Sequence, residues 1–242
     1  GETMKKKLII NKIYDWMTEN HDIIPQPARN YIHEWYKNTP IDNLKNKDSY
    51  KLIPTGKTIR TCPSFMDVFK DGYVIPAPCD IWFYVGEHRE QWEWKASTDI
   101  FNSSSYNFIE QHDDGQMVEH LPNKNIVKIF KMHTPWWFKA PKGYSIRQLP
   151  LMYHYENTDW FIPYGIVKSD KYIEFNPQIC ITSRKKEVLI KRGSPLCYLV
   201  PYKRSDTLDL KIEPIKKHKD NITSSIFNVV SSFRSNYHRY ED

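Results

Sequence analysis

The chain has 242 residues, a formal net charge of +6 and an aromatic content of 14%. Sixteen prolines against eight glycines, with sixteen tyrosines and eight tryptophans, favour a β-rich body with proline-marked turns and argue against a helical bundle. No apolar run is long enough to span a membrane, and the positive charge is not concentrated as in a nucleic-acid-binding arm. The length fits one large domain or one domain with extensions.

The cysteines indicate the cellular compartment. All four stand in apolar surroundings and none belongs to a Cys-x-x-Cys pair: Cys62, Cys79, Cys180 and Cys197. Buried free thiols are therefore expected, which favours a reducing cytoplasm. No signal peptide is visible near the N-terminus, because polar residues interrupt the apolar stretch there. Residues 1–3 before Met4 resemble the remnant of an expression tag, so we expect Met4 to be the native start.

Three regions are expected along the chain. Residues 1–55 form an N-terminal helical region with a linker, residues 56–212 a β-rich core domain, and residues 213–242 a C-terminal helix or arm. Apolar residues at helical spacing predict a first helix over 4–20. A second, short helix is expected from Pro27 to Tyr36, since proline suits the first helical turn.

Short strands are expected through the core domain, because apolar runs and alternating segments are separated by Pro, Gly, Asn or Asp. The expected strands are 73–76, 80–85, 91–95, 126–132, 136–139, 144–148, 165–167, 172–175, 179–182, 188–190 and 196–200. This spacing predicts an α+β, β-rich protein whose main body is an antiparallel barrel or sandwich. In the strand that holds Trp136 and Trp137, neighbouring side chains point to opposite faces, so at least one indole is expected outside the core.

Three segments carry a resemblance to a known family. Pro141–Arg147 is a Pro-x-Gly-Tyr turn, Tyr164–Tyr172 is a glycine-led apolar turn, and Ile190–Pro201 is an apolar strand fed by a basic turn. Their order and spacing resemble the barrel of the dUTPase and dCTP-deaminase family, from about residue 126 onward. The resemblance implies a barrel fold and, since barrels of that family form trimers, a homotrimer.

The chain departs from this family where the chemistry is done. The positions that match the family's nucleoside hairpin are Gly165, Asp170 and Tyr172. Lys168 stands where the family has the aspartate that positions the attacking water, and a protonated lysine is not a base. The family's phosphate-binding turn is replaced by residues 148–151, and its glycine-rich C-terminal arm has no counterpart in 213–242. The resemblance therefore implies a family fold with degraded catalytic motifs.

A second resemblance rests on segments spread over most of residues 25–205. These segments are Pro27–Ala28, Glu34–Tyr36, Cys62–Asp67, Gly72–Tyr73, Pro135–Trp136, Pro141–Ser145, Gly193–Pro195 and Pro201–Arg204. They resemble a family of uncharacterised proteins encoded by tailed phages and some bacteria. The resemblance implies a phage or bacterial origin, with the host cytoplasm as the location.

The leading hypothesis for function is a non-catalytic binding protein. A pocket between residues 143–148 and 165–172 is expected to bind a nucleotide or another phosphorylated small molecule, and in a phage this could sequester a nucleotide signal of host defence. The residues expected to contact the ligand are Trp160 and Tyr172 by stacking or packing, Arg147, Lys168 and Arg192 by charge, and Asp170. No catalytic residue, metal or cofactor is expected.

Two alternatives stay open. A divergent, metal-dependent nucleotide pyrophosphohydrolase would use Asp170 as its base with magnesium, and a virion or host-interaction protein would need no small ligand. His112, Asp114 and His120 have part of the spacing of a metal site. They fall in a segment expected to be a flexible turn, so they are not predicted to bind metal.

Overall fold

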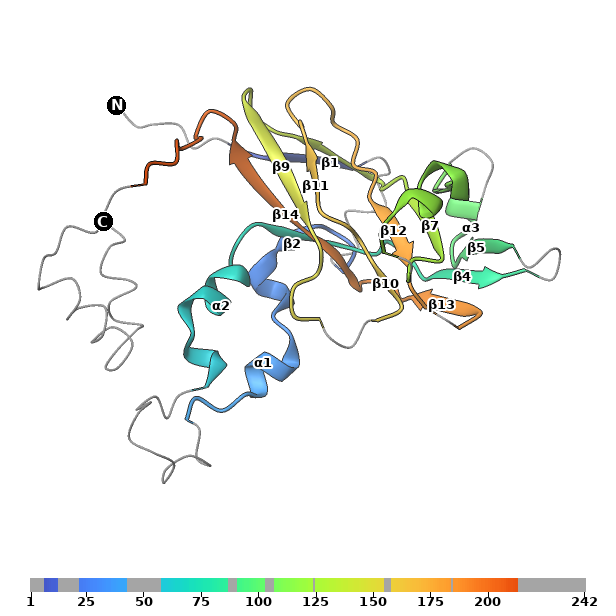
Figure 1. Ribbon diagram of the computed structural model, residues 1–242, viewed down its shortest axis with the longest axis horizontal. Helices are drawn as coiled ribbons and strands as arrows, with labels where there is room; N and C mark the ends of the chain where they lie inside the picture. The colour runs from blue at the N-terminus through green and yellow to red at the C-terminus, as the bar shows by residue number, and fades with distance from the viewer. Residues whose placement is uncertain are drawn as a thin grey trace, which may run out of the picture. The chain divides into compact units, whose positions relative to one another are not determined.

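The computed structural model describes residues 7–12, 22–42, 58–86, 91–102, 107–123, 125–154, 158–183 and 185–212. The chain divides into two compact units (Figure 1). The larger unit combines residues 1–28 with 72–206, and the smaller unit combines residues 29–71 with 207–242. The C-terminal helix or arm expected over 213–242 lies outside the described residues.

The larger unit is built from antiparallel sheets. A five-stranded sheet has the order β11 (Gly165–Val167), β9 (Tyr144–Leu149), β14 (Pro195–Lys203), β3 (Tyr73–Pro76) and β2 (Gln26–Pro27). A four-stranded sheet has the order β10 (Trp160–Phe161), β12 (Gln178–Ile181), β7 (Lys128–Met132) and β6 (Ile109–Gln111). A three-stranded sheet contains β13 (Glu187–Ile190), β4 (Ile81–Val85) and β5 (Trp92–Ala96), and a two-stranded sheet pairs β1 (Ile9–Lys12) with β8 (Trp136–Lys139).

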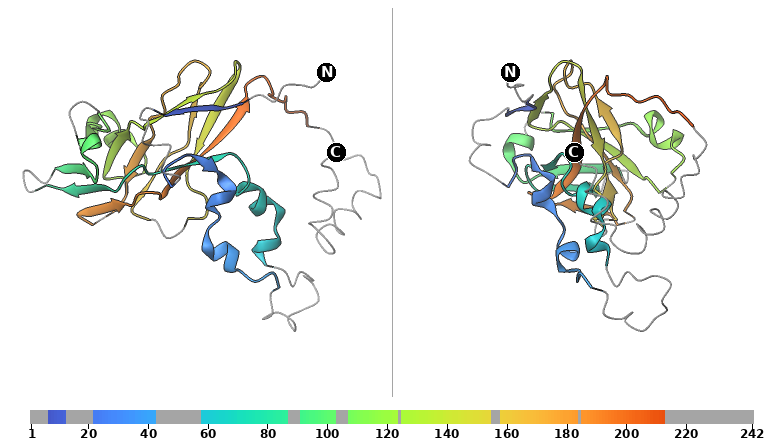
Figure 2. Two further views of the ribbon diagram at one scale, coloured as in Figure 1. Left: turned by 180° about the vertical axis from the view of Figure 1, so that it is seen from behind. Right: turned by 90° about the vertical axis from the view of Figure 1, so that its left-hand side faces the viewer.

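These sheets share one hydrophobic core. Figures 1 and 2 show the arrangement of their strands. Phe83 of β4 and Phe130 of β7 are both fully buried, with ring centroids 4.6 Å apart. Phe101 of α3 (Asp99–Asn102) stacks on Phe108 at 4.2 Å, just before β6. The prediction of a β-rich, antiparallel fold is confirmed, whereas no sheet in the described part of the chain closes on itself into a barrel.

The prediction of a helix over residues 4–20 is wrong for its described part. Residues 9–12 form strand β1, which pairs with β8 in the register Ile10 opposite Phe138. Leu8 and Ile10 pack against the core while Ile9 is 49% exposed, which is the two-residue period of a strand. Pairing with a distant strand overrides the helical spacing here. Residues 4–6 and 13–20 lie outside the described residues.

The smaller unit contains short helices. They are η4 (Ile59–Thr61), α1 (Glu34–Asn38) and α2 (Pro63–Val68), and η2 (Ala28–Tyr31) spans the boundary between the units. Tyr36 of α1 connects them, because its hydroxyl donates to the carbonyl of Arg60 over 3.1 Å and its ring lies 4.8 Å from that of Phe69. The short helix expected from Pro27 to Tyr36 is thus present as two shorter turns. No helix among the described residues is long and apolar enough to cross a bilayer.

Candidate functional site

The two segments of the sequence-predicted pocket are neighbours in the five-stranded sheet. β9 pairs with β11, so that Arg147 stands opposite Ile166 and Gln148 opposite Gly165. The Gln148 amide also donates to the carbonyl of Pro163 over 2.6 Å. Arg147 is exposed, and its guanidinium carbon lies 4.3 Å from the ring centroid of Tyr202 on β14. A hydrogen-bonded pair of strands that carries the exposed Arg147 therefore occupies this position.

Asp170 is the most constrained residue of this region. Its carboxylate accepts bonds from the backbone N–H of Gly143 over 2.8 Å and from both terminal nitrogens of Arg204 over 2.9 and 2.6 Å. The side chain is only 5% exposed. The Arg204 guanidinium, followed by the Gly143 N–H, holds the pKa of the Asp170 carboxyl below its ordinary value. An ionised carboxylate whose oxygens are already bonded is a poor general base, and here it joins two turns to the end of β14.

Lys168 and Tyr172 flank Asp170 and face solvent. Lys168 is exposed, and Tyr172 is 51% exposed. The Tyr172 hydroxyl donates to a carboxylate oxygen of Glu174 over 3.1 Å and accepts from the amide nitrogen of Asn176 over 3.2 Å. The phenol is thus held in place by two side chains of the segment that follows it.

Arg192 lies at the other end of β14. Its guanidinium contacts the Asp22 carboxylate over 2.7 and 3.1 Å, and its backbone N–H donates to Asp80 over 2.7 Å. The nine residues of β14 separate Arg192 from Arg204, which at about 3.3 Å per residue corresponds to about 30 Å. Arg192 therefore does not join Lys168 and Asp170 in one site.

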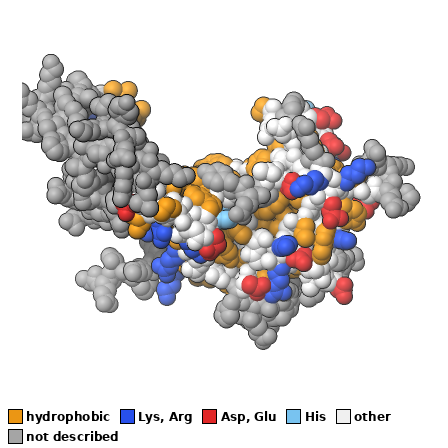
Figure 3. Space-filling view, turned by 90° about the horizontal axis from the view of Figure 1, so that it is seen from below, with side chains coloured by type: hydrophobic (Ala, Val, Ile, Leu, Met, Phe, Trp, Pro, Cys, Tyr) orange, Lys and Arg blue, Asp and Glu red, His pale blue; other side chains and the backbone are white. Residues whose placement is uncertain are grey.

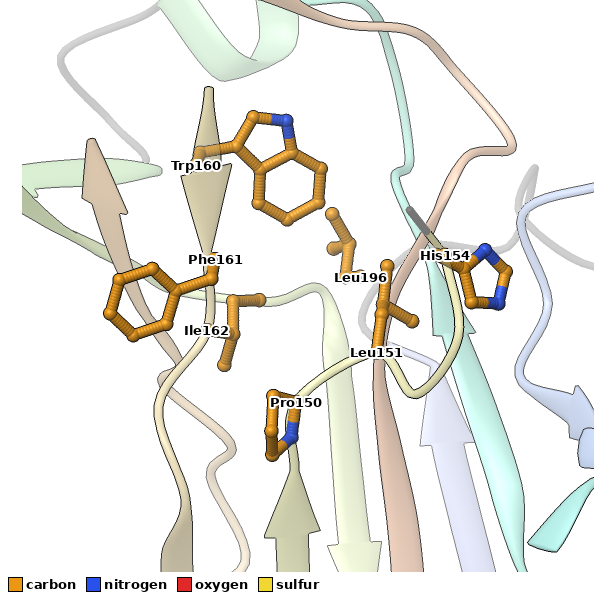
Figure 4. A pocket seen from close by; sticks show the side chains of 7 residues that line it. All are labelled: Pro150, Leu151, His154, Trp160, Phe161, Ile162 and Leu196. Atoms are coloured by element: carbon orange, nitrogen blue, oxygen red, sulfur yellow. The ribbon is translucent and has the colours of Figure 1, made fainter. Parts of the chain in front are cut away.

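Trp160 is also placed apart, in the four-stranded sheet. It is 8% exposed and lines a cavity of about 60 Å³ together with Pro150, Leu151, His154, Phe161, Ile162 and Leu196 (Figure 4). In that view Trp160 and Leu196 point toward each other, whereas Phe161 and His154 lie on opposite sides. Ligand pockets usually measure about 300–1,000 Å³. The space beside Trp160 is therefore too small for a nucleotide.

A larger concavity lies where the edge strands of two sheets meet. β5 is the edge of the three-stranded sheet and β6 is the edge of the four-stranded sheet. Together with β7 and the short turns η5 (Asp114–Gln116) and η6 (Val118–His120), they enclose a groove of about 570 Å³. We call it the β5–β7 groove; its lining residues are Gln91, Trp92, Gln111, His112, Asp113, Asp114, Gly115, Glu119 and Lys128.

A buried ammonium group anchors the wall of the β5–β7 groove. The Lys128 side chain is 8% exposed, and its Nζ lies 2.7 Å from Oδ1 of Asp114. The Gln111 amide, in the orientation that satisfies both of its ends, accepts from the same Nζ over 2.9 Å and donates to the carbonyl of Trp92 over 3.1 Å. A buried charge needs such partners to offset its desolvation. Gln111 thereby links the two sheet edges.

The turn above the groove is more ordered than the sequence indicates. Asp113 accepts from the N–H of Gly115 over 2.9 Å, and Gln116 completes a capping box at the start of η5. His112 contacts Gln116 through Nδ1 at 3.3 Å, while its Nε2 is buried without a partner among the described residues. A buried polar nitrogen in that state calls for a water or a ligand group. His120 contacts the carbonyl of Gly115 at 2.9 Å.

Two further features bear on the ligand: the carboxylate, imidazole and thiol groups, and the distribution of charge on one face. The described residues contain no group of three or more His, Cys, Asp or Glu side chains arranged to hold a metal ion. On the face seen in Figure 3, acidic and basic side chains lie interspersed with hydrophobic ones. The net positive charge is therefore not gathered into one basic field on that face.

Sequence reasoning missed the β5–β7 groove. The signal that was available is Lys128, a lysine set inside the apolar run from Ile126 to Phe130. A cation in such a strand has to be paired if it is buried. The partner carboxylate of Asp114 lies on a turn that the sequence does not place beside that strand.

The comparisons with known proteins were largely negative. No family model matches the chain. No curated protein matches it either. Among solved structures, the native dUTPase of EIAV is similar over 60% of this chain and 86% of that chain, with 12% sequence identity and a TM-score of 0.31. At this TM-score the similarity decides neither the fold nor the activity.

Proposed function

We propose that this protein is a non-catalytic binding protein that holds a nucleoside-containing ligand in the β5–β7 groove. The observation that carries the proposal is the groove itself, because its volume of about 570 Å³ lies within the range of small-molecule sites. Its lining offers hydrogen-bond donors, acceptors and one indole. The proposal retains the hypothesis of a binding protein and assigns its ligand to this groove instead of the paired strands β9 and β11.

The chemistry of the lining fits a nucleoside. The indole of Trp92 can stack on a base, and the amides of Gln91 and Gln111 can bond to base edges. Carboxylates such as those of Asp113 and Glu119 are the groups that proteins use on ribose hydroxyls. The side chain of His112 also lines the groove and adds a further polar group to it.

The charges of the groove orient the ligand. Three carboxylates line it, from Asp113, Asp114 and Glu119, against the single ammonium of Lys128, which Asp114 already pairs. A phosphate deep in the groove would face these carboxylates, and like charges repel each other. Any phosphate of the ligand therefore points out of the groove into solvent, and the base and the sugar make the contacts.

A second candidate site is the exposed strip of β9 and β11. Arg147 lies over Tyr202, and Lys168 is exposed at the end of β11. Two exposed cations beside an aromatic ring suit a phosphorylated ligand. Of the residues that the sequence assigned to a nucleotide pocket, Arg147 and Lys168 remain together on this strip.

We propose a protein without catalytic activity because the carboxylate of Asp170 is already engaged in hydrogen bonds. Its bonds to Arg204 and Gly143 would have to break before it could serve as the base of a magnesium-dependent pyrophosphohydrolase. The proposal further includes a phage origin, degraded dUTPase-like motifs, a homotrimer and the sequestration of a host-defence signal in the cytoplasm. A virion or host-interaction protein without a small ligand is the remaining alternative.

The test is a thermal-shift panel of nucleosides, nucleoside mono- and triphosphates, dinucleotides and cyclic nucleotides, with and without magnesium. A ligand that binds only the native state raises the melting temperature. The panel is run on the wild type, on His112→Ala and Glu119→Ala in the groove, and on Arg147→Ala and Lys168→Glu in the strip. Each variant's melting temperature without ligand serves as its own baseline.

The expected result is a nucleoside-dependent shift that is lost in His112→Ala and Glu119→Ala and kept in Arg147→Ala and Lys168→Glu. The reverse pattern, with a shift only for phosphorylated ligands, would place the ligand on the strip. Magnesium-dependent pyrophosphate release would establish the hydrolase. No shift with any compound would refute the nucleotide proposal at both sites.

A further inference from the structure

A surface patch lies on β8, outside the groove and the strip, where β1 flanks that strand on one side and an isolated bridge flanks it on the other. β1 pairs with β8 so that Asn11 stands opposite Trp137 and Ile9 opposite Lys139. On the other side of β8, Trp137 forms an isolated antiparallel bridge with Glu174. The N–H of Phe138 donates to the carbonyl of residue 173 over 2.8 Å, which continues that pairing.

Six side chains make up this surface. One row is Asn11, Trp137 and Glu174, and the next pair along β1 and β8 is Ile9 and Lys139. Tyr172 adjoins Glu174 through its hydroxyl group. Neighbouring strands lie about 4.8 Å apart, and alternate side chains share one face. The contact between the Tyr172 hydroxyl and the Glu174 carboxylate places both on that face. We call this surface the Trp137 platform.

The platform presents aromatic rings to solvent. Trp137 is 39% exposed and Tyr172 is 51% exposed, whereas the preceding Trp136 is 3% exposed and belongs to the core. The Tyr172 ring is restrained, because its hydroxyl bonds to Glu174 and to Asn176. Exposed large aromatic side chains that are fixed by neighbours form rigid contact surfaces at low entropic cost.

We propose that the Trp137 platform binds a neutral hexopyranose unit of a glycan. A pyranose ring has an apolar C–H face that suits the indole, and hydroxyl groups around its rim. On the two sides of Trp137, the amide of Asn11 and the carboxylate of Glu174 stand in the same row. The amide donates and accepts hydrogen bonds and the carboxylate accepts them, which suits sugar hydroxyls that can do both.

The charges of the platform select a neutral ligand. Glu174 stands directly beside Trp137, so a phosphate of a nucleic acid stacked on this indole would meet a carboxylate. Lys139 in the next row balances that charge, which leaves the six side chains with no net charge. A polyhydroxylated, uncharged ligand meets no such penalty. The inference is independent of the β5–β7 groove, which contains none of these residues.

The test is affinity electrophoresis of the purified protein through native gels that contain dextran, mannan, galactan or soluble N-acetylglucosamine oligosaccharides. The variants are Trp137→Ala, Tyr172→Phe and Glu174→Gln. Tyr164→Ala is the matched control, because Tyr164 is a 56% exposed aromatic residue outside the platform. A single-stranded dT oligonucleotide is titrated in parallel at two salt concentrations.

The expected result is retardation by at least one polysaccharide that does not change with salt. Trp137→Ala weakens it by about tenfold or more, as loss of a stacking ring does. Glu174→Gln and Tyr172→Phe weaken the retardation by about two- to tenfold, because each alters the hydrogen bond between the Tyr172 hydroxyl and the Glu174 carboxylate. Tyr164→Ala leaves the retardation unchanged. Retardation by none of the four sugars, or retardation that survives Trp137→Ala, overturns the inference. Salt-sensitive binding of the oligonucleotide alone would identify a nucleic-acid platform and overturn it equally.

Discussion

Replacing Gly72 by alanine tests how tightly the start of β3 approaches β14. Gly72 has a φ of +70°, and a Cβ placed there would lie 2.2 Å from the carbonyl oxygen of Leu199 and 3.1 Å from Cγ2 of Val200. Gly143 provides a matched control, because its φ is +86° and nothing lies within 4 Å of the added Cβ. Both substitutions impose a left-handed backbone on alanine, and only one of them forces two strands apart.

The magnitudes follow from these two costs. A left-handed conformation costs alanine about 1–2 kcal/mol, and the lower entropy of the unfolded chain returns about 0.4–1 kcal/mol. Gly143→Ala should therefore lower the free energy of unfolding by about 1 kcal/mol. In Gly72→Ala the contact with backbone adds an overpacking cost of about 1–3 kcal/mol. The expected loss for Gly72→Ala is thus about 2–4 kcal/mol.

Urea unfolding followed by tryptophan fluorescence measures the difference. The signal reports mainly on the larger unit, since every tryptophan among the described residues except Trp35 belongs to it. An unchanged dependence of the free energy on urea concentration in both variants would show that the unfolded states are comparable. If Gly72→Ala were no more destabilising than Gly143→Ala, the close approach of residue 72 to Leu199 would be refuted.

Three further outcomes are expected. Asp170→Asn should lower the free energy of unfolding at neutral pH. Because the folded pKa of Asp170 lies below its ordinary 3.8, the difference in unfolding free energy between wild type and variant should shrink as the pH falls below that value. Unfolding curves at several pH values measure this difference, and a difference that does not change with pH would contradict the ion pair. Cys62 is half-buried and should react with Ellman's reagent in the native state. Burial raises the pKa of the Cys180 thiol to about 11, so Cys180 should react only on unfolding. Rapid labelling of a second thiol in the native state would contradict the burial. Phe83→Ala should lower the free energy of unfolding in urea by about 3–5 kcal/mol, and a loss below about 1.5 kcal/mol would show that the site collapses or is loosely packed.

The strands could be predicted where burial alternates along them. In β8, Trp136 and Phe138 are buried while Trp137 and Lys139 are exposed, which is the pattern that the sequence indicates. The same reasoning failed at β1, since Leu8 and Ile10 are compatible with either a helix or a strand until β8 is present beside them. Strand type in a short apolar segment depends on its partner.

The site was harder to predict than the strands, because its contacts join residues far apart in sequence. Asp170 and Arg204 are 34 positions apart, and only the fold shows that their ion pair occupies the carboxylate. Arg192 was assigned to the same site by its charge, yet it pairs with Asp22 at the other end of β14. Charge and spacing identify candidate residues, whereas the ends of the strands decide which of them meet.

The backbone bond between Ala28 and Gly72 closes a narrow stem at the base of the segment 29–71. The N–H of Ala28 lies 3.0 Å from the carbonyl oxygen of Gly72, and both residues belong to the larger unit. Segment 29–71 thus leaves and re-enters the larger unit at one point, in the manner of an inserted module. Insertions at such points are tolerated because the host's strand register does not depend on their length. We therefore expect changes in the length of segment 29–71 to leave the pairing of β2 with β3 in the larger unit unaltered.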